Sequence, residues 1–151
     1  MVETSYITWL YMIASIAILV GILTDLRSGL IPYVVTIPLL ICALIIAVLN
    51  STLLIAIGLG TLSFLLLWIL AMLTGHNCWN RGDCEECISI GGGDIKFSTG
   101  IAVLIASPIG ILVFLAVSYV SATFFSLISD VKKIKMAPWL ALGCSVALWA
   151  F

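Results

Sequence analysis

The stretch ISIGGGDIKFSTG, residues 88–100, places three glycines, an aspartate and a lysine within an otherwise apolar part of the chain. A glycine run interrupts a helix and lets another segment approach closely. At membrane depth, irregular backbone is tolerated only where it is buried in protein or lines water. We therefore expect residues 91–93 to open a cavity. Asp94 then begins the next helix, where the backbone amides and the helix dipole favour a carboxylate.

The composition is that of an integral membrane protein. Of the 151 residues, 64% are hydrophobic and 9% are charged, whereas a soluble domain carries about 25% charged residues. The mean hydropathy is +1.34. This apolar composition makes the lipid bilayer the expected environment. The net charge of −1 provides no basic surface for binding nucleic acid. We expect one membrane domain over residues 1–151.

Runs of about 20 apolar residues are long enough to cross a bilayer, and the chain has six of them. The sequence therefore predicts an all-α fold, a polytopic bundle of about six transmembrane helices. The predicted spans are Tyr6–Leu23, Ile31–Leu49, Leu53–Leu73, Ile88–Ser107, Ile109–Ile128 and Met136–Phe151.

Basic residues in short loops predict the orientation of the bundle, because such loops stay in the cytoplasm. Five of the six lysines and arginines fall in the first, third and fifth loops, while the second and fourth loops carry no charge. Both termini are therefore expected outside and the odd-numbered loops inside. The residues concerned are Arg27, Arg81, Lys132, Lys133 and Lys135.

The same orientation places Asp25, at the end of the first span, and Asp94 on the cytoplasmic side. A helix from Asp94 to Ser107 is about 21 Å long, shorter than the roughly 30 Å of hydrocarbon, so Asp94 is expected below the membrane edge. Two carboxyls that share a proton can activate water and protonate a carbonyl under attack. Other interpretations are a helix N-cap at Asp94 and a solvated turn at Asp25. A small transporter or proton-conducting protein and a non-catalytic scaffold are alternative functions.

Three segments carry recognisable motifs: GGGDIKF, LTDLRSGLIPYVVT and KMAPWLALG. Together they resemble the type IV prepilin peptidases, which are G-x-G-D membrane aspartyl proteases. GGGDIKF begins with the signature at Gly91–Asp94, and KMAPWLALG is similar to the final helix of the family, with Pro138 and Gly143 aligned. LTDLRSGLIPYVVT looks like the family's D-x-R-x-x-x-I-P-n-x-x-T pattern. Its matching positions are Asp25, Arg27, Ile31, Pro32 and Thr36.

The resemblance implies an endopeptidase that removes the basic leader from prepilin-like or preflagellin-like precursors at the cytoplasmic face of the cell membrane. Asp25 and Asp94 would be the catalytic pair, and no cofactor would be required. The chain starts directly at its first span, so it resembles the minimal, peptidase-only branch without the methyltransferase region. The motif residues expected to support the pair are Gly91, Gly93, Lys96, Arg27 and Pro32.

A cysteine-rich loop is predicted at about residues 74–90. His76, Cys78, Cys84 and Cys87 follow the pattern H-x-C-x5-C-x2-C, and four such ligands suit tetrahedral zinc. A reducing cytoplasm argues against a disulfide. The alternative is a solvated acidic loop, because Asp83, Glu85 and Glu86 lie among the cysteines. A structural zinc is thus one of two open interpretations.

Overall fold

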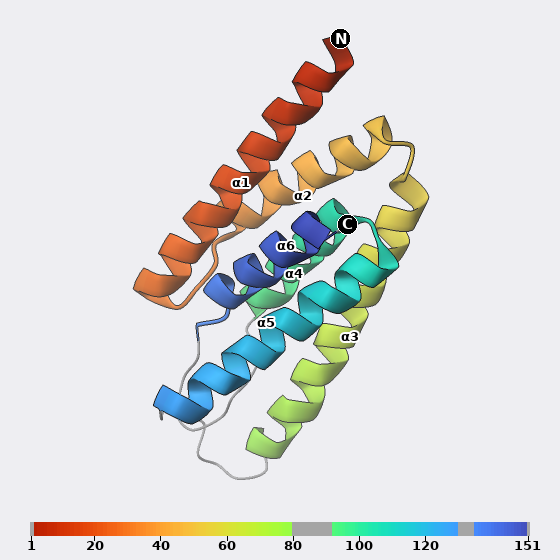
Figure 1. Cartoon of the computed structure of the whole chain (residues 1–151). Coiled ribbons are helices and arrows are strands. Elements are labelled where there is room, and N and C mark those ends of the chain that lie inside the picture. The colour runs from red at the N-terminus through yellow and green to blue at the C-terminus, as the bar shows by residue number, and fades with distance from the viewer. Residues whose placement is uncertain (1, 80–91, 130–134, 151) are drawn as a thin grey trace.

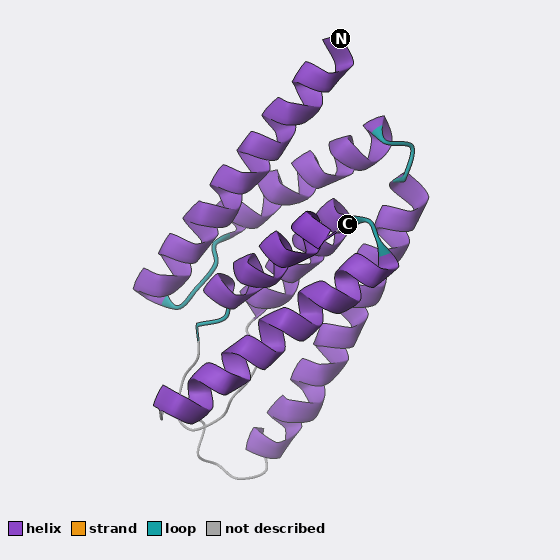
Figure 2. Cartoon of the chain, viewed as in Figure 1, coloured by secondary structure: helices purple, strands orange, loops and turns teal. Residues whose placement is uncertain are grey.

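The computed structural model describes residues 2–79, 92–129 and 135–150, and within these ranges every element is a helix (Figures 1 and 2). The all-α prediction is confirmed for this part of the chain. The helices are α1 (Val2–Ser28), α2 (Tyr33–Leu49), α3 (Leu53–Trp79), α4 (Gly92–Ile105), α5 (Pro108–Ser129) and α6 (Ala137–Ala150).

Helix α4 forms the centre of the bundle (Figure 1). Eight of its 14 residues are buried, and it packs against α2, α3, α5 and α6. Its side chains Phe97 and Ile101 have no exposed surface, and neither does Phe114 of α5. The helix that begins at the glycine run is therefore the one that the other helices surround.

The turn between α1 and α2 is built from a glycine and a proline. Gly29 has a φ of +67°, a left-handed conformation that glycine adopts without a Cβ clash, and its N–H donates to the Asp25 carbonyl at 2.8 Å. Pro32 is the N-cap of α2 with an extended backbone, and its carbonyl accepts the N–H of Val35 at 3.0 Å. Because this turn is short, α2 folds back beside α1.

Four helices meet at one end of the bundle, which we call the Asp25 end (Figure 1). Helix α1 ends there, and α2, α4 and α6 begin there. At the opposite end, α2 turns into α3 and α4 turns into α5. The Asp25 end is therefore where the two predicted acidic positions, the I-P turn and the final motif come together.

Three helices are long and apolar enough to cross a membrane, with the matching segments Tyr6–Ser28, Leu53–Leu73 and Pro108–Phe125. Large apolar side chains such as Leu19, Leu54 and Leu127 are exposed on the outer faces of these helices. Exposed apolar surface of this extent is typical of contact with lipid. Helices α2 and α6 are apolar but shorter, and the 14 residues of α4 extend only about 21 Å. Six complete spans thus remain a prediction.

Two predicted boundaries are wrong. Helix α1 continues to Ser28, so Arg27 lies in its last turn and not in a loop. Helix α3 continues to Trp79, so the backbone of residues 74–79, expected in the cysteine-rich loop, is helical. In both places a polar segment extends the helix beyond its apolar run, because helical hydrogen bonding does not require apolar side chains.

Candidate active site

Asp25 is buried in the last turn of α1, with 3% of its surface exposed. Its Oδ2 atom accepts a hydrogen bond from the backbone N–H of Ala137 at 3.0 Å. Ala137 is the first residue of α6. A buried carboxylate needs a hydrogen-bond partner, and the start of a helix supplies both an amide donor and a favourable dipole. The contact joins segments 112 positions apart.

The sequence of α6 explains why the Ala137 amide serves Asp25. The carbonyl of Met136 accepts hydrogen bonds from the N–H groups of both Trp139 and Leu140, each at 3.0 Å. Pro138 has no N–H and fits the first turn of a helix. In the first turn of α6, the Ala137 N–H is thus the backbone donor to a side chain of another helix, the Asp25 carboxylate.

A second contact joins the same two segments. The ammonium of Lys135 donates a hydrogen bond to the backbone carbonyl of Leu26, next to Asp25. Carbonyls in the last turn of a helix have no partner within the helix, and a cation there interacts favourably with the helix dipole. The end of α1 and the start of α6 therefore hold each other by two hydrogen bonds.

Asp94 is the third residue of α4 and is half-buried. Asp94 was expected to begin this helix after a break at residues 91–93, but the helix already includes Gly92 and Gly93. Asp94 thus lies in the first turn of the central helix, at the Asp25 end of the bundle.

Helices α1 and α4 meet at Gly21 and Phe97. A Cβ added to Gly21 would lie 2.8 Å from the ring of Phe97, so the aromatic ring occupies the space that the glycine leaves open. Residues three and four apart share one face of a helix. Asp25 follows Gly21 by four positions and Asp94 precedes Phe97 by three. Because the two helices run in opposite directions (Figure 1), both aspartates lie about one helical turn from this contact, toward the Asp25 end.

Gly93 allows the start of α4 to touch the I-P turn. A Cβ at this position would lie 3.1 Å from the carbonyl oxygen of Ile31 and 3.3 Å from the Ile31 Cβ. A Cβ at Gly92 would meet nothing within 4 Å. The close approach to the I-P turn therefore requires a glycine at position 93 but not at position 92. Gly91 lies outside the described residues.

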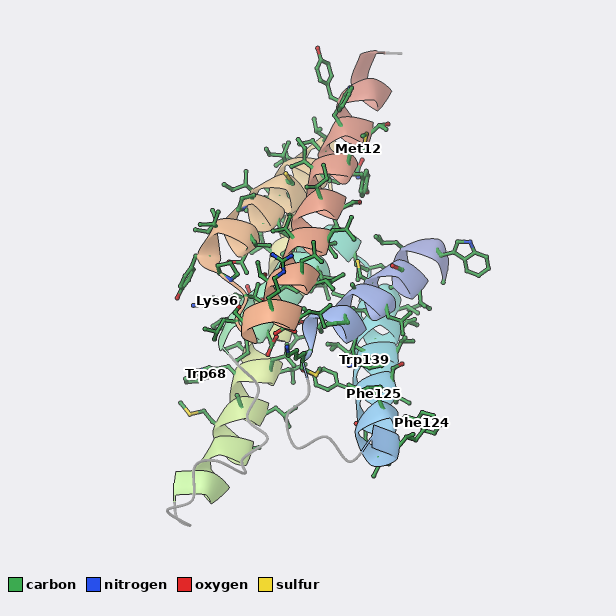
Figure 3. All side chains as sticks on the ribbon, turned by 90° about the vertical axis from the view of Figure 1, so that its left-hand side faces the viewer. Met12, Trp68, Lys96, Phe124, Phe125 and Trp139 are labelled. Carbon is green, nitrogen blue, oxygen red and sulfur yellow. The ribbon has the colours of Figure 1, made fainter. Side chains whose placement is uncertain are left out.

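Lys96 joins α4 to the start of α2. Its ammonium donates a hydrogen bond to the hydroxyl of Tyr33 and lies 4.0 Å from the centre of the same ring. Figure 3 shows Lys96 beside α2, whereas Trp139 and Phe125 lie between α6 and α5, with ring centres 5.2 Å apart. Arg27 and Pro32 are exposed at the same end of the bundle. Three of the predicted supporting residues, namely Lys96, Arg27 and Pro32, therefore lie at the Asp25 end of the bundle.

Two carboxyls at one end of a helical bundle can act as general acid and general base, provided that they approach each other. The described residues contain no group of three or more His, Cys, Asp or Glu side chains that could hold a metal ion. The zinc candidates fall outside that description: Cys84 and Cys87 lie in residues 80–91, and the side chains of His76 and Cys78 are not described. Zinc binding stays a prediction.

Comparison with known protein families identifies the chain. The sequence profile described as "Type IV leader peptidase family" matches residues 11–127, a range that contains both aspartates. The chain belongs to the type IV leader peptidase family. It is therefore a peptidase, and its apolar helices make it an integral membrane protein. No curated protein and no solved structure matches the chain.

Sequence reasoning missed the role of the residues before and at the start of α6. The basic residues after the fifth span indicated only orientation, yet Lys135 contacts the backbone of α1. The side chain of Ala137 gives no hint of its contact with Asp25, because the hydrogen bond is donated by the backbone N–H.

Proposed function

We propose that this family member is a membrane aspartyl endopeptidase that removes the basic leader from type IV prepilin-like precursors. In the proposed mechanism, Asp25 and Asp94 form a dyad that activates one water molecule. The observation that supports the dyad best is the contact between Gly21 and Phe97. This contact lies about one helical turn from each aspartate, which supports the pairing of Asp25 with Asp94.

Hydrolysis starts with one carboxyl protonated and the other ionised. The ionised group takes a proton from water as the water oxygen attacks the scissile carbonyl carbon. The protonated group gives its proton to the carbonyl oxygen, which forms a tetrahedral diol. Collapse of the diol breaks the C–N bond and transfers a proton to the leaving nitrogen. The dyad again holds one proton, and the products are a carboxylic acid and an amine.

The proposed site faces the cytoplasm, because the basic residues of the odd-numbered loops predict that side. The leader of the precursor is basic and remains in the cytoplasm, while its apolar segment lies in the bilayer. An active site recessed at the inner membrane edge suits a bond between these two parts. Membership in a peptidase family favours this function over proton conduction or transport by the same two carboxylates.

The proposal is tested with membranes that contain the wild-type protein and a panel of leader-bearing pilin precursors. Mass spectrometry of the products identifies the cleaved bond. We expect one cut between the basic leader and the apolar segment. An intact panel, with enzyme shown to be inserted and folded, would refute leader cleavage as the function.

A further inference from the structure

Two hydrogen bonds join the end of α1 to Lys135 and Ala137. Both of these residues lie beyond the segment that matches the family profile. That match ends at residue 127, whereas α6 begins at Ala137. The Ala137 amide contacts a side chain that we assign to catalysis, and Lys135 contacts the carbonyl of the next residue along α1. The residues at and just before the start of α6 thus donate two hydrogen bonds to the last turn of α1, one to a side chain and one to the backbone.

We propose that the start of α6 is a positioning element for the Asp25 carboxyl, with the Ala137 amide and the Lys135 ammonium as its two donors. This inference rests on the proposed function, because it assigns geometry to the proposed dyad. The Ala137 N–H makes Oδ2 an obligatory acceptor. The Oδ1 atom is then the oxygen that carries or takes up the proton, and the rotation of the carboxyl group is fixed.

The element is suited to this role because α6 is itself held firmly. A Cβ at Gly143 would lie 2.5 Å from the Phe114 carbonyl oxygen and 2.2 Å from the Ser118 hydroxyl oxygen, so α6 and α5 are in close contact there. The rings of Trp139, two residues after Ala137, and Phe125 of α5 pack together, with their centres 5.2 Å apart. Ala137 is completely buried. A donor on such a rigid element holds a reactive group more precisely than a loop would.

The first test removes the donor and leaves the helix start intact. Ala137→Pro lacks the N–H, and proline is favoured at the first position of a helix. We expect kcat for leader cleavage to fall about 10- to 100-fold with KM unchanged, because a small displacement of a reacting group has an effect of this order. A kcat within twofold of wild type would overturn the proposal.

Two control variants separate positioning from disruption of the fold. Ala137→Gly retains the N–H and removes only the methyl group, so it is expected to keep most of the wild-type kcat. Leu53→Pro introduces a proline at the first residue of α3, at the opposite end of the bundle, and is expected to leave kcat unchanged. If all three variants lose activity equally, the amide has no special role.

The second donor is tested by rescue. Lys135→Met removes the ammonium and retains an unbranched side chain, and we expect a lower kcat with KM unchanged. Lys135→Arg keeps a donor for the Leu26 carbonyl and is expected to recover at least half of the lost rate. If Lys135→Met changes only KM, the ammonium binds substrate and does not position Asp25.

A third measurement needs no enzymatic activity. Amide hydrogen exchange at Ala137 is compared in the wild type and in Asp25→Ala, with the Leu140 amide as reference because its acceptor is the Met136 carbonyl. We expect exchange at Ala137 to accelerate about tenfold or more and exchange at Leu140 to stay unchanged. Equal exchange at Ala137 in both proteins would refute the contact. If the contact is present but no precursor is cleaved, the proposed function fails and the positioning geometry stands.

Discussion

The carbonyl oxygen of Ile31 lies 3.1 Å from the position that a Cβ would take on Gly93. The turn between α1 and α2 thus rests on the first turn of α4, immediately before Asp94. This contact fixes the start of the central helix relative to the end of α1, where Asp25 lies. The glycine is needed here for close packing, and its φ is not in the left-handed region.

Gly93→Ala and Gly92→Ala form a matched pair that tests this contact. An added methyl group at Gly93 must push the Ile31 backbone away, so we expect a loss of about 1–2 kcal/mol of stability and at least severalfold slower cleavage. Gly92→Ala meets open space, and we expect it to be neutral or stabilising by up to about 1 kcal/mol. Thermal unfolding in detergent and cleavage rates are the measurements. Equal behaviour of the two variants would contradict the packing.

Asp25→Asn and Asp94→Asn test the dyad directly. Each change keeps the size of the side chain and removes its capacity to exchange a proton, so we expect cleavage to fall by about 10²- to 10⁴-fold or more. Insertion and helical content are expected to stay at the wild-type level. The rate is measured in membranes with a leader-bearing precursor. Full activity in either dyad variant would rule out the proposed mechanism.

Gly21→Ala tests the contact between α1 and α4. The added methyl group would lie 2.8 Å from the Phe97 ring, which is completely buried and cannot move without disturbing its neighbours. We expect a loss of about 1–3 kcal/mol of stability. Gly58→Ala is the control, because a Cβ there meets nothing within 4 Å. The free energy of unfolding in mixed detergent measures both, and a larger loss in Gly58→Ala would contradict the packing.

Lys96 and Tyr33 are expected to act as one unit. Tyr33→Phe removes the hydrogen-bond acceptor but keeps the ring below the ammonium, so its effect on cleavage should be smaller than that of Lys96→Met, which removes both contacts. Tyr33→Phe combined with Lys96→Met is expected to cost no more than Lys96→Met alone. A double-mutant cycle on kcat/KM measures the coupling. Strictly additive effects would show that the two residues act independently.

The cysteine-rich segment gives a prediction about metal. If His76, Cys78, Cys84 and Cys87 bind a structural zinc, the purified protein contains about one equivalent of zinc. Cys84→Ser combined with Cys87→Ser then removes the metal and lowers the Tm, with a smaller effect on the cleavage chemistry. Elemental analysis gives the metal content, and metal-free wild-type protein with an unchanged Tm would end the zinc hypothesis.

The amino-acid sequence by itself determined the helical class, the membrane character and the two acidic motifs. These properties follow from local signals: long apolar runs, glycines that interrupt them, and charges at their ends. Asp94 lies in the first turn of a helix as predicted, although that helix already includes Gly92 and Gly93, which were expected to interrupt it. The ends of α1 and α3 were predicted too early, because polar residues continue a helix as readily as they form a loop.

Only the tertiary structure decided how the aspartates are held. The ring of Phe97 against Gly21 and the Ala137 amide on Asp25 join residues that are far apart in sequence. Neither contact has a local signal, because a backbone amide exists at nearly every position and a glycine does not identify its neighbour. The direction in which each helix packs selects which amide and which ring meet the site, and that direction arises only when all six helices pack together.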